Sequence, residues 1–314
     1  MQRVLLSVIL SLSLLGGAAR ATAADKLTVL LDWFVNPDHA TLIIAGEKGF
    51  FEAQGLDVEL IAPADPNDPP KLVAAGKADL AITYQPQLHM QVGEGLPLKR
   101  VATLIATPLN SVVVLRDGPV KSLADLKGRK IGYSIGGFET ALLKRMLEPH
   151  GVTLDELTLI NVNFSLSPSL LAGQVDAVIG AFRNFELNQL DIEGSPGRAF
   201  FPEEEGVPAY DELILVANSA NLEDARLPRF IEALEQAAHY LVNHPEESWE
   251  LFIRNHKDLD DELNRRAFAA TLPRFALRPA ALDSGRYERF AAFLLQQGLI
   301  REAKPASDYA VVIR

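Results

Sequence analysis

Short apolar runs alternate with helical segments along most of the chain. The apolar runs have the length of buried strands, and we predict strands at residues 27–31, 56–61, 79–83, 98–104, 111–115, 130–133, 157–162, 176–180 and 213–217. Helices are predicted at residues 39–54, 71–75, 85–94, 122–128, 138–149, 167–172, 184–190 and 286–297, and over much of the chain after residue 228. Residues 194–208, which are rich in Gly, Pro and Glu, are predicted to be irregular.

Strands that alternate with helices are typical of parallel α/β sheets, and here the alternation starts twice. We therefore predict two α/β lobes, with residues 25–112 and 212–314 in the first and residues 113–211 in the second. The chain would cross between them near residues 111–117 and 208–213. Ligands bind at the carboxyl ends of strands in such sheets, so the cleft between the lobes is the expected ligand site.

The first 24 residues have the pattern of a secretory signal peptide. Arg3 precedes an apolar run over residues 4–15, and Ala21-Thr22-Ala23 forms a small-x-small cleavage site. The apolar run is shorter than the roughly 20 residues that span a bilayer. The chain has no cysteine, which excludes disulfides and a lipid-modified cysteine after the signal. We therefore expect a soluble protein in the periplasm.

Charge narrows the choice of partners. The formal net charge is −11, and loss of Arg3 and Arg20 with the signal would make it −13. An acidic protein of this kind is a poor partner for nucleic acid or for an anionic membrane surface. We find no His, Asp and Glu spacing that suggests a metal site, and no nucleophile motif.

Four phrases of the sequence carry a family resemblance: LDWFVNPDH at residues 31–39, GFFEAQGL at 49–56, LADLKGRKIG at 123–132 and AFRNFE at 181–186. Together they resemble the thiamine-pyrimidine group of periplasmic binding proteins, over residues 27–255. The group includes binders of formylaminopyrimidine and, on the same fold, the fungal pyrimidine synthase. The resemblance implies a type II periplasmic binding protein fold, with two lobes, a ligand cleft and two crossover strands.

The resemblance also implies a small pyrimidine ligand, formylaminopyrimidine or hydroxymethylpyrimidine, and an ABC transporter permease as partner. The membrane would be reached only through the permease, and no cofactor is expected. The enzymatic relative carries a pyridoxal-phosphate lysine and a histidine, which align near Thr83 and Gln87, with His89 two positions away. Its cysteine-rich run aligns with residues 206–213, in a chain without cysteine. A Schiff base requires a lysine amine, so we expect a binder rather than an enzyme.

Two alternatives stay open: an enzyme like the synthase, and a binder of riboflavin, a sulfonate or another small aromatic molecule. Related proteins on this fold bind such ligands, and fold alone does not choose among them.

Candidate ligand-binding residues of the first lobe cluster after the first strand. Trp33 would stack on a flat heterocycle, or lie in the core. Asp32 would accept a hydrogen bond from a ligand amine, or cap the following turn. Asn36 and His39 lie beside them, and His39 near the helix start is a ligand contact or a structural histidine.

Other candidates lie in loops that follow strands or precede helices: Tyr84, Gln85, Asn110, Ser134, Gly136 and Gly137. For each of them the alternative is a turn or hinge residue. Free backbone N–H groups in the loop at 134–137 would favour a carbonyl or anionic group. Glu139, in the first turn of the next helix, would repel an anion and so favours a neutral or cationic ligand.

Glu186 is the strongest candidate. The resemblance implies a carboxylate here against the amino edge of a pyrimidine. A 4-aminopyrimidine presents an N–H donor beside a ring nitrogen, and a carboxyl group pairs with both through two parallel hydrogen bonds. The alternative is a solvated glutamate on a helix. Phe182 and Asn184, in the same phrase, would complete the wall of the site.

Overall fold

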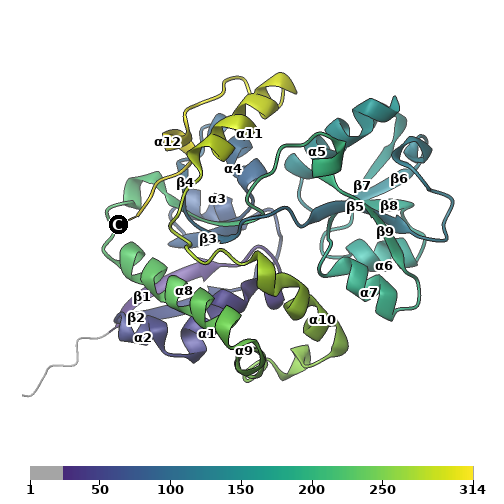
Figure 1. Ribbon diagram of the computed structural model, residues 1–314. Helices are drawn as coiled ribbons and strands as arrows, with labels where there is room; N and C mark the ends of the chain where they lie inside the picture. The colour runs from purple at the N-terminus through teal and green to yellow at the C-terminus, as the bar shows by residue number, and fades with distance from the viewer. Residues whose placement is uncertain (1–23, 314) are drawn as a thin grey trace, which may run out of the picture.

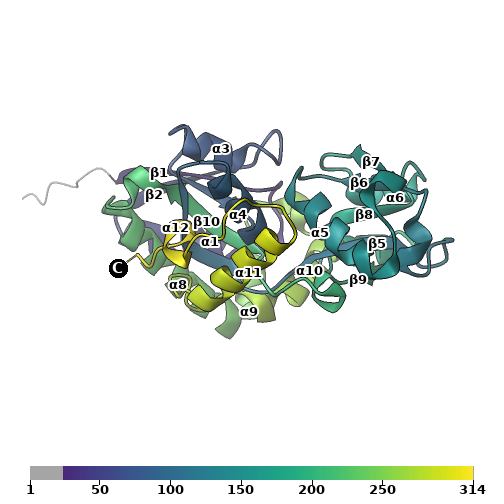
Figure 2. The same cartoon turned by 90° about the horizontal axis from the view of Figure 1, so that it is seen from above.

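Two five-stranded sheets form the cores of two lobes in the computed structural model, which describes residues 24–313. The strands of the first sheet, in spatial order, are β2 (Leu56–Ile61), β1 (Asp25–Leu30), β3 (Leu80–Thr83), β10 (Leu213–Asn218) and β4 (Leu98–Ile105). Those of the second sheet are β7 (Thr158–Asn161), β6 (Lys130–Tyr133), β8 (Ala177–Phe182), β5 (Asn110–Leu115) and β9 (Gly197–Phe200). Figures 1 and 2 show the two lobes side by side, each with helices around its sheet.

Both sheets are mixed, whereas the strand–helix alternation predicted parallel ones. Strand β1 is parallel to β2 and β3, but β10 runs antiparallel to β3 and β4. In the second sheet β6 is parallel to β7 and β8, while β5 is antiparallel to β8 and β9. The reversed strands are β5 and β10, the first strands after each passage between the sheets. The prediction failed there because apolar periodicity does not encode strand direction.

The helices of the first lobe are α1 (Ala40–Glu47), α2 (Phe50–Ala53), α3 (Pro69–Ala74), α4 (Gln85–Gly93), α8 (Arg226–Asn243), α9 (Pro245–Phe252), α10 (Glu262–Thr271), α11 (Ser284–Gln296) and α12 (Ala306–Tyr309). Those of the second are α5 (Phe138–Leu147), α6 (Leu166–Leu171) and α7 (Glu186–Ile192). Within the described residues, no helix has the length and apolar character needed to cross a membrane.

Three local predictions were wrong. The single helix at residues 39–54 is interrupted, because Gly49 adopts φ +70° and ends the first helix before α2 begins. Strand β9 lies within the stretch predicted to be irregular; it pairs with β5 alone, and its half-buried residues lack the apolar run of a central strand. Residues 122–128 contain only the 3₁₀ turn Leu123–Leu126. The predicted signal segment lies outside the described residues, apart from Ala24.

The chain passes between the sheets twice, between β4 and β5 and between β9 and β10. The first passage precedes residue 111, because Asn110–Leu115 is already a strand of the second sheet. Buried Glu212, in the second passage, links the two: its Oε2 accepts the backbone N–H groups of Leu109 at 2.5 Å and Asn110 at 2.9 Å. Burial raises the pKa of Glu212 to about 7.

Candidate functional site

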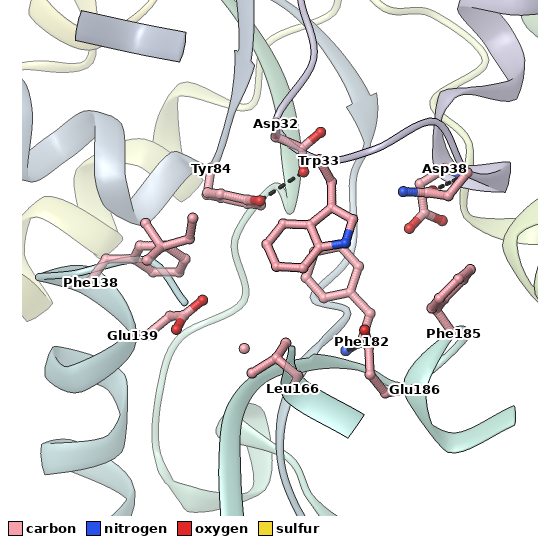
Figure 3. A pocket seen from close by; sticks show the side chains of 13 residues that line it. Asp32, Trp33, Asp38, Tyr84, Phe138, Glu139, Leu166, Phe182, Phe185 and Glu186 are labelled. Carbon is pink, nitrogen blue, oxygen red and sulfur yellow. Dashed lines mark hydrogen bonds between the residues drawn. The ribbon is translucent and has the colours of Figure 1, made fainter. Parts of the chain in front are cut away.

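A cavity lies between the two lobes. Six of the residues that line it were predicted from the sequence: Asp32, Trp33, Asn36, Tyr84, Phe182 and Glu186. Seven were not named as ligand contacts: Asp38, Ile135, Phe138, Glu139, Leu166, Gly180 and Phe185. Figure 3 shows side chains of both lobes pointing into the same space.

Strand ends place these side chains. Asp32 and Trp33 follow β1, and Tyr84 follows β3, so all three reach the cavity from the carboxyl edge of the first sheet. Phe182 ends β8, and Glu186 begins α7 directly after it. The carboxyl ends of parallel strands in the two sheets therefore face one another, as expected for a ligand cleft in α/β sheets.

Asp32 organises the first-lobe wall. Its Oδ1 lies 2.9 Å from Nε2 of His39, and its Oδ2 accepts the Tyr84 hydroxyl at 2.7 Å. His39 is fully buried and lies behind the wall rather than on it. The turn is capped by Asn36, whose Oδ1 accepts the backbone N–H of Asp38 at 2.8 Å, and not by Asp32. Burial and the neighbouring Asp32 carboxylate raise the pKa of the Tyr84 phenol well above its ordinary value.

Glu139 is a buried carboxyl group of the second-lobe wall. Its Oε2 accepts the backbone N–H of Ser134 at 2.8 Å. The carboxyl lies directly against Gly180, where a Cβ atom would be 2.4 Å from Oε1. Gly180 also has φ +100°, a backbone region that residues with side chains rarely adopt. Burial is the main cause that raises the pKa of Glu139 to about 8.

Glu186 is 8% exposed and lines the same cavity from α7. Its Oε2 accepts the backbone N–H of Phe182 at 2.6 Å, which fixes the carboxyl group against the end of β8. Burial raises its pKa to about 8, despite the hydrogen bond from Phe182. A neutral carboxyl group held in place can both donate and accept a hydrogen bond.

Aromatic rings form the remaining walls. The Trp33 ring, from the first lobe, meets Phe164 of the second lobe edge to face, with centroids 4.6 Å apart. Tyr84 of the first lobe and Phe138 of the second are instead stacked, with ring centroids 5.0 Å apart. Trp33, Tyr84 and Phe138 line the cavity, so it has apolar ring surfaces in its wall.

Asn184 ties the lobes together next to the cavity. Its Nδ2 donates to Asp38 Oδ1 at 2.6 Å and to Thr271 Oγ1 at 2.7 Å, both in the first lobe. Thr271 Oγ1 lies 3.0 Å from the same Asp38 oxygen. Burial outweighs the neighbouring His39 and these hydrogen bonds, and raises the pKa of Asp38 to about 6.

Asn184→Ala is expected to favour the open form of the ligand-free protein. The variant loses a hydrogen bond to a carboxyl group, worth about 1.5–3 kcal/mol, which would shift the open–closed equilibrium about 10-fold or more. Small-angle X-ray scattering would detect this as a larger radius of gyration. Asn188→Ala is the matched control, because Asn188 Nδ2 donates to Asn184 O at 2.8 Å within the same lobe. Equal scattering from both variants would contradict the role of Asn184.

The other predicted site residues lie around the cavity without lining it. Gln85 is buried, and its Oε1 accepts the N–H of Asp211 at 2.8 Å in the second passage. Asn110 accepts the N–H of Gly180 at 3.2 Å through Oδ1. In the loop at 134–137, the Ser134 N–H is taken by Glu139, and the Gly136 N–H donates to Asn67 Oδ1 at 2.9 Å.

Gly137, the N-cap residue directly before α5, has φ +91°. The N–H groups of Ser134 and Gly136 therefore bond within the protein, and Asn67 forms a second link between the lobes.

Five of the seven residues missed by sequence reasoning fall into two groups. Glu139 was assigned to a helix start and Asp38 directly precedes a predicted helix, and the signal that they face the cavity was their position in the loop or helix start that follows a strand. Phe138, Phe185 and Leu166 are ordinary apolar residues at the beginnings of helices, and nothing in their local pattern separates them from core positions.

The carboxyl groups that line the cavity have no basic side chain beside them among its described lining residues. Four carboxyl groups line it, from Asp32, Asp38, Glu139 and Glu186, and none of the described residues that line it is Lys, Arg or His. Such a site favours a ligand with N–H donors or positive charge over an anion. Among residues 24–313, no cluster of three or more His, Asp or Glu side chains is placed to hold a metal ion.

The fold is that of the periplasmic binding proteins of type II. The alkanesulfonate-binding protein of Xanthomonas axonopodis pv. citri, solved with MOPS, superposes with a TM-score of 0.72 over 93% of this chain and 99% of its own, at 16% identity. At this identity the likeness concerns the fold alone.

The chain belongs to the NMT1/THI5-like family, whose model matches residues 36–248. This confirms the resemblance found in the sequence. A Haemophilus influenzae protein named for thiamine biosynthesis is 57% identical over 93% of each chain. The formylaminopyrimidine-binding protein of Halalkalibacterium halodurans is 34% identical over 83% of this chain and 80% of its own. A 4-amino-5-hydroxymethyl-2-methylpyrimidine phosphate synthase of Uromyces fabae is 28% identical over 78% of this chain and 75% of its own.

Proposed function

We propose that this chain is the substrate-binding component of an ABC importer, exported to the periplasm, and that its ligand is a thiamine pyrimidine precursor. The candidates are formylaminopyrimidine and hydroxymethylpyrimidine. The observation that carries the proposal is the cavity between the lobes, which combines aromatic walls with four carboxyl groups and, among the described residues, no basic side chain. A flat, neutral ring with an amino group matches that chemistry.

Glu186 would recognise the amino edge of the ring. With its carboxyl group protonated, it donates to the ring nitrogen and accepts from the amino group through two parallel hydrogen bonds. Trp33 would stack on the face of the ring. Asp32 and Glu139 would offer further acceptors, and the closed lobes would exclude water from these bonds.

Two relatives support the ligand class. The 34% identical relative is named as a formylaminopyrimidine-binding protein, and the 57% identical relative is named for thiamine biosynthesis. Export would use residues 1–24 as the signal peptide. The lobes, for which we propose boundaries between β4 and β5 and between β9 and β10, would close over the ligand and then dock on a permease.

A sulfonate ligand is disfavoured by charge, although an alkanesulfonate-binding protein shares the fold. The ionised carboxyl groups of this lining would repel an anion, and no basic side chain among the described lining residues compensates.

We propose that the chain is not an enzyme, although some relatives are named synthases. Thr83 Oγ1 and Gln87 Oε1 form a hydrogen bond of 2.6 Å with each other at the positions aligned with the lysine and histidine of the enzyme. His89 is buried against Tyr287, Phe290 and Tyr309, away from the cavity lining. Thr83 has no amine group, so it cannot form a Schiff base with pyridoxal phosphate.

Isothermal calorimetry of the mature protein tests the proposal. Hydroxymethylpyrimidine and formylaminopyrimidine are expected to bind with 1:1 stoichiometry, and MOPS is expected to give no heat of binding. Titration with pyridoxal phosphate should produce no Schiff-base absorbance. Binding of MOPS without either pyrimidine would overturn the ligand assignment, and a stable Schiff-base band would revive the enzyme.

A further inference from the structure

The Tyr84 ring is held in one place in the wall of the cavity. It is stacked against Phe138 and meets Phe182 edge to face, with ring centroids 5.0 and 6.3 Å apart. Figure 3 shows the ring extending into the space between the lobes, with its hydroxyl group beside Asp32 and Trp33. The position of the phenol oxygen is therefore set by packing, and the direction of its proton decides what it can bind.

His39, which lies behind the wall, fixes the direction of these hydrogen bonds. Its Nδ1 accepts the backbone N–H of Asn36 at 3.3 Å, so Nδ1 carries no proton. An imidazole without a proton on Nδ1 carries it on Nε2. Nε2 lies 2.9 Å from Asp32 Oδ1 and therefore donates to it. The backbone of Asn36 thus determines, through the ring of His39, that Asp32 accepts at Oδ1.

The second oxygen of Asp32 takes the proton of Tyr84. A carboxylate accepts hydrogen bonds and cannot donate them, so Oδ2 accepts the Tyr84 O–H at 2.7 Å. Burial and the Asp32 carboxylate raise the pKa of the Tyr84 phenol well above its ordinary value, which keeps its single proton in place. A hydrogen bond to a charged acceptor is also stronger than one between neutral groups. The Tyr84 oxygen therefore has only lone pairs to offer to a ligand.

We propose that Tyr84 is a specificity-determining residue that accepts a hydrogen bond from the ligand, and that Asp32 and His39 are positioning residues that prevent it from donating one. The inference rests on the pyrimidine function proposed above. The orienting role of Asp32 is additional to the acceptor that its own carboxylate offers.

The chemistry of the candidate ligands fits an acceptor at this position. Both carry a donor besides the amino group that Glu186 would take, because hydroxymethylpyrimidine has a hydroxyl group and formylaminopyrimidine has an amide N–H. Tyr84 lines the cavity from the first lobe and Glu186 from the second, so one molecule between the lobes meets both. A substituent that only accepts hydrogen bonds would place its lone pairs against those of Tyr84 and is disfavoured.

The aldehyde analogue of hydroxymethylpyrimidine is the probe, because its formyl group is close in size to the hydroxymethyl group but only accepts. In calorimetry at pH 7, the wild-type protein is expected to bind hydroxymethylpyrimidine about 3- to 10-fold more tightly than the aldehyde. Asp32→Asn keeps the shape of the side chain and reverses one bond. The new amide oxygen accepts from His39 Nε2, so the amide nitrogen faces Tyr84 and donates to it. The Tyr84 proton is then available to the ligand, and the ratio of the two affinities should shift about 3- to 10-fold toward the aldehyde.

Tyr84→Phe removes the hydroxyl group, so it should weaken hydroxymethylpyrimidine about 3- to 10-fold and bring the two affinities together. This variant tests the acceptor role even if Asp32→Asn does not fold, which thermal unfolding shows. Asp125→Asn is the matched control, because Asp125 Oδ2 also accepts a hydroxyl, that of Ser122 at 2.9 Å, but lies outside the cavity lining. It should leave the ratio unchanged.

Equal binding of the two ligands by the wild-type protein, or an unchanged ratio in Tyr84→Phe, would overturn the acceptor role of Tyr84 and leave the pyrimidine function standing. A ratio that changes in Tyr84→Phe but not in a folded Asp32→Asn would overturn the positioning role of Asp32 and His39. Failure of the wild-type protein to bind either hydroxymethylpyrimidine or formylaminopyrimidine would overturn the function and this inference together.

Discussion

Glu186→Leu is expected to lower the affinity for hydroxymethylpyrimidine by at least about 100-fold. The substitution removes both hydrogen bonds to the amino edge of the ring, each worth roughly 1.5 kcal/mol or more in a buried site, and 1.4 kcal/mol corresponds to a tenfold change in affinity. It also leaves the Phe182 N–H without the acceptor that it has at 2.6 Å. Calorimetry at pH 7 measures the loss, and thermal unfolding of the variant shows whether the fold is kept.

Glu186→Gln is the control that separates hydrogen bonding from charge. The amide keeps one donor and one acceptor in the same place, so its affinity should stay within about tenfold of the wild type. The wild-type carboxyl group has a pKa of about 8, and above that pH it loses the proton that bonds to the ring nitrogen. Wild-type affinity should therefore fall between pH 7 and 9, whereas the glutamine variant should show no such fall. A glutamine variant as weak as the leucine variant would argue against the paired hydrogen bonds.

Gly180→Ala is expected to destabilise the protein by about 2–4 kcal/mol and to reduce ligand binding severely. The new Cβ would be 2.4 Å from Glu139 Oε1, so the buried carboxyl group must move or the strand must shift. Overpacking of this kind costs about 1–3 kcal/mol, and an alanine at positive φ adds roughly 1 kcal/mol. Thermal unfolding gives the loss of stability, and calorimetry with hydroxymethylpyrimidine gives the loss of affinity.

Gly173→Ala provides a close comparison in the same lobe. Gly173 has φ +65°, but an added Cβ would have no neighbour within 4 Å. This variant should show only the backbone cost, about 1 kcal/mol, and should bind normally. If Gly180→Ala proved no less stable than Gly173→Ala, the Glu139 carboxyl group would have room to move, and its fixed position in the cavity wall would be wrong.

Local pattern was enough to predict much of the fold and part of the site. Asp32, Trp33 and Tyr84 were found because each directly follows an apolar strand, and such positions meet at one edge of a sheet. The first residues of β2 and β6 were also predicted correctly, because Gly55 and Gly128 lie just before these strands and both adopt positive φ, which ends the preceding element.

Long-range pairing explains what the sequence could not provide. Asn184 was predicted to face the ligand, but its side chain bonds with Asp38 and Thr271, which lie 146 and 87 positions away in the chain. Thr271 belongs to α10, a helix with no separate prediction because its mostly polar residues follow a region that reads as continuously helical. No local sequence pattern shows which distant residue will form a hydrogen bond with a given polar side chain.

The position of β10 in the middle of the first sheet has a consequence for the order in which the protein is assembled. All five strands of the second sheet come from one continuous stretch, residues 110–200, whereas the first sheet needs β10 at residues 213–218 between β3 and β4. When the chain is synthesised from its N-terminus, all strands of the second sheet are made before the last strand of the first sheet. Residues 25–105 must therefore wait, with β3 and β4 lacking their shared neighbour, until the chain has passed through the other lobe and returned.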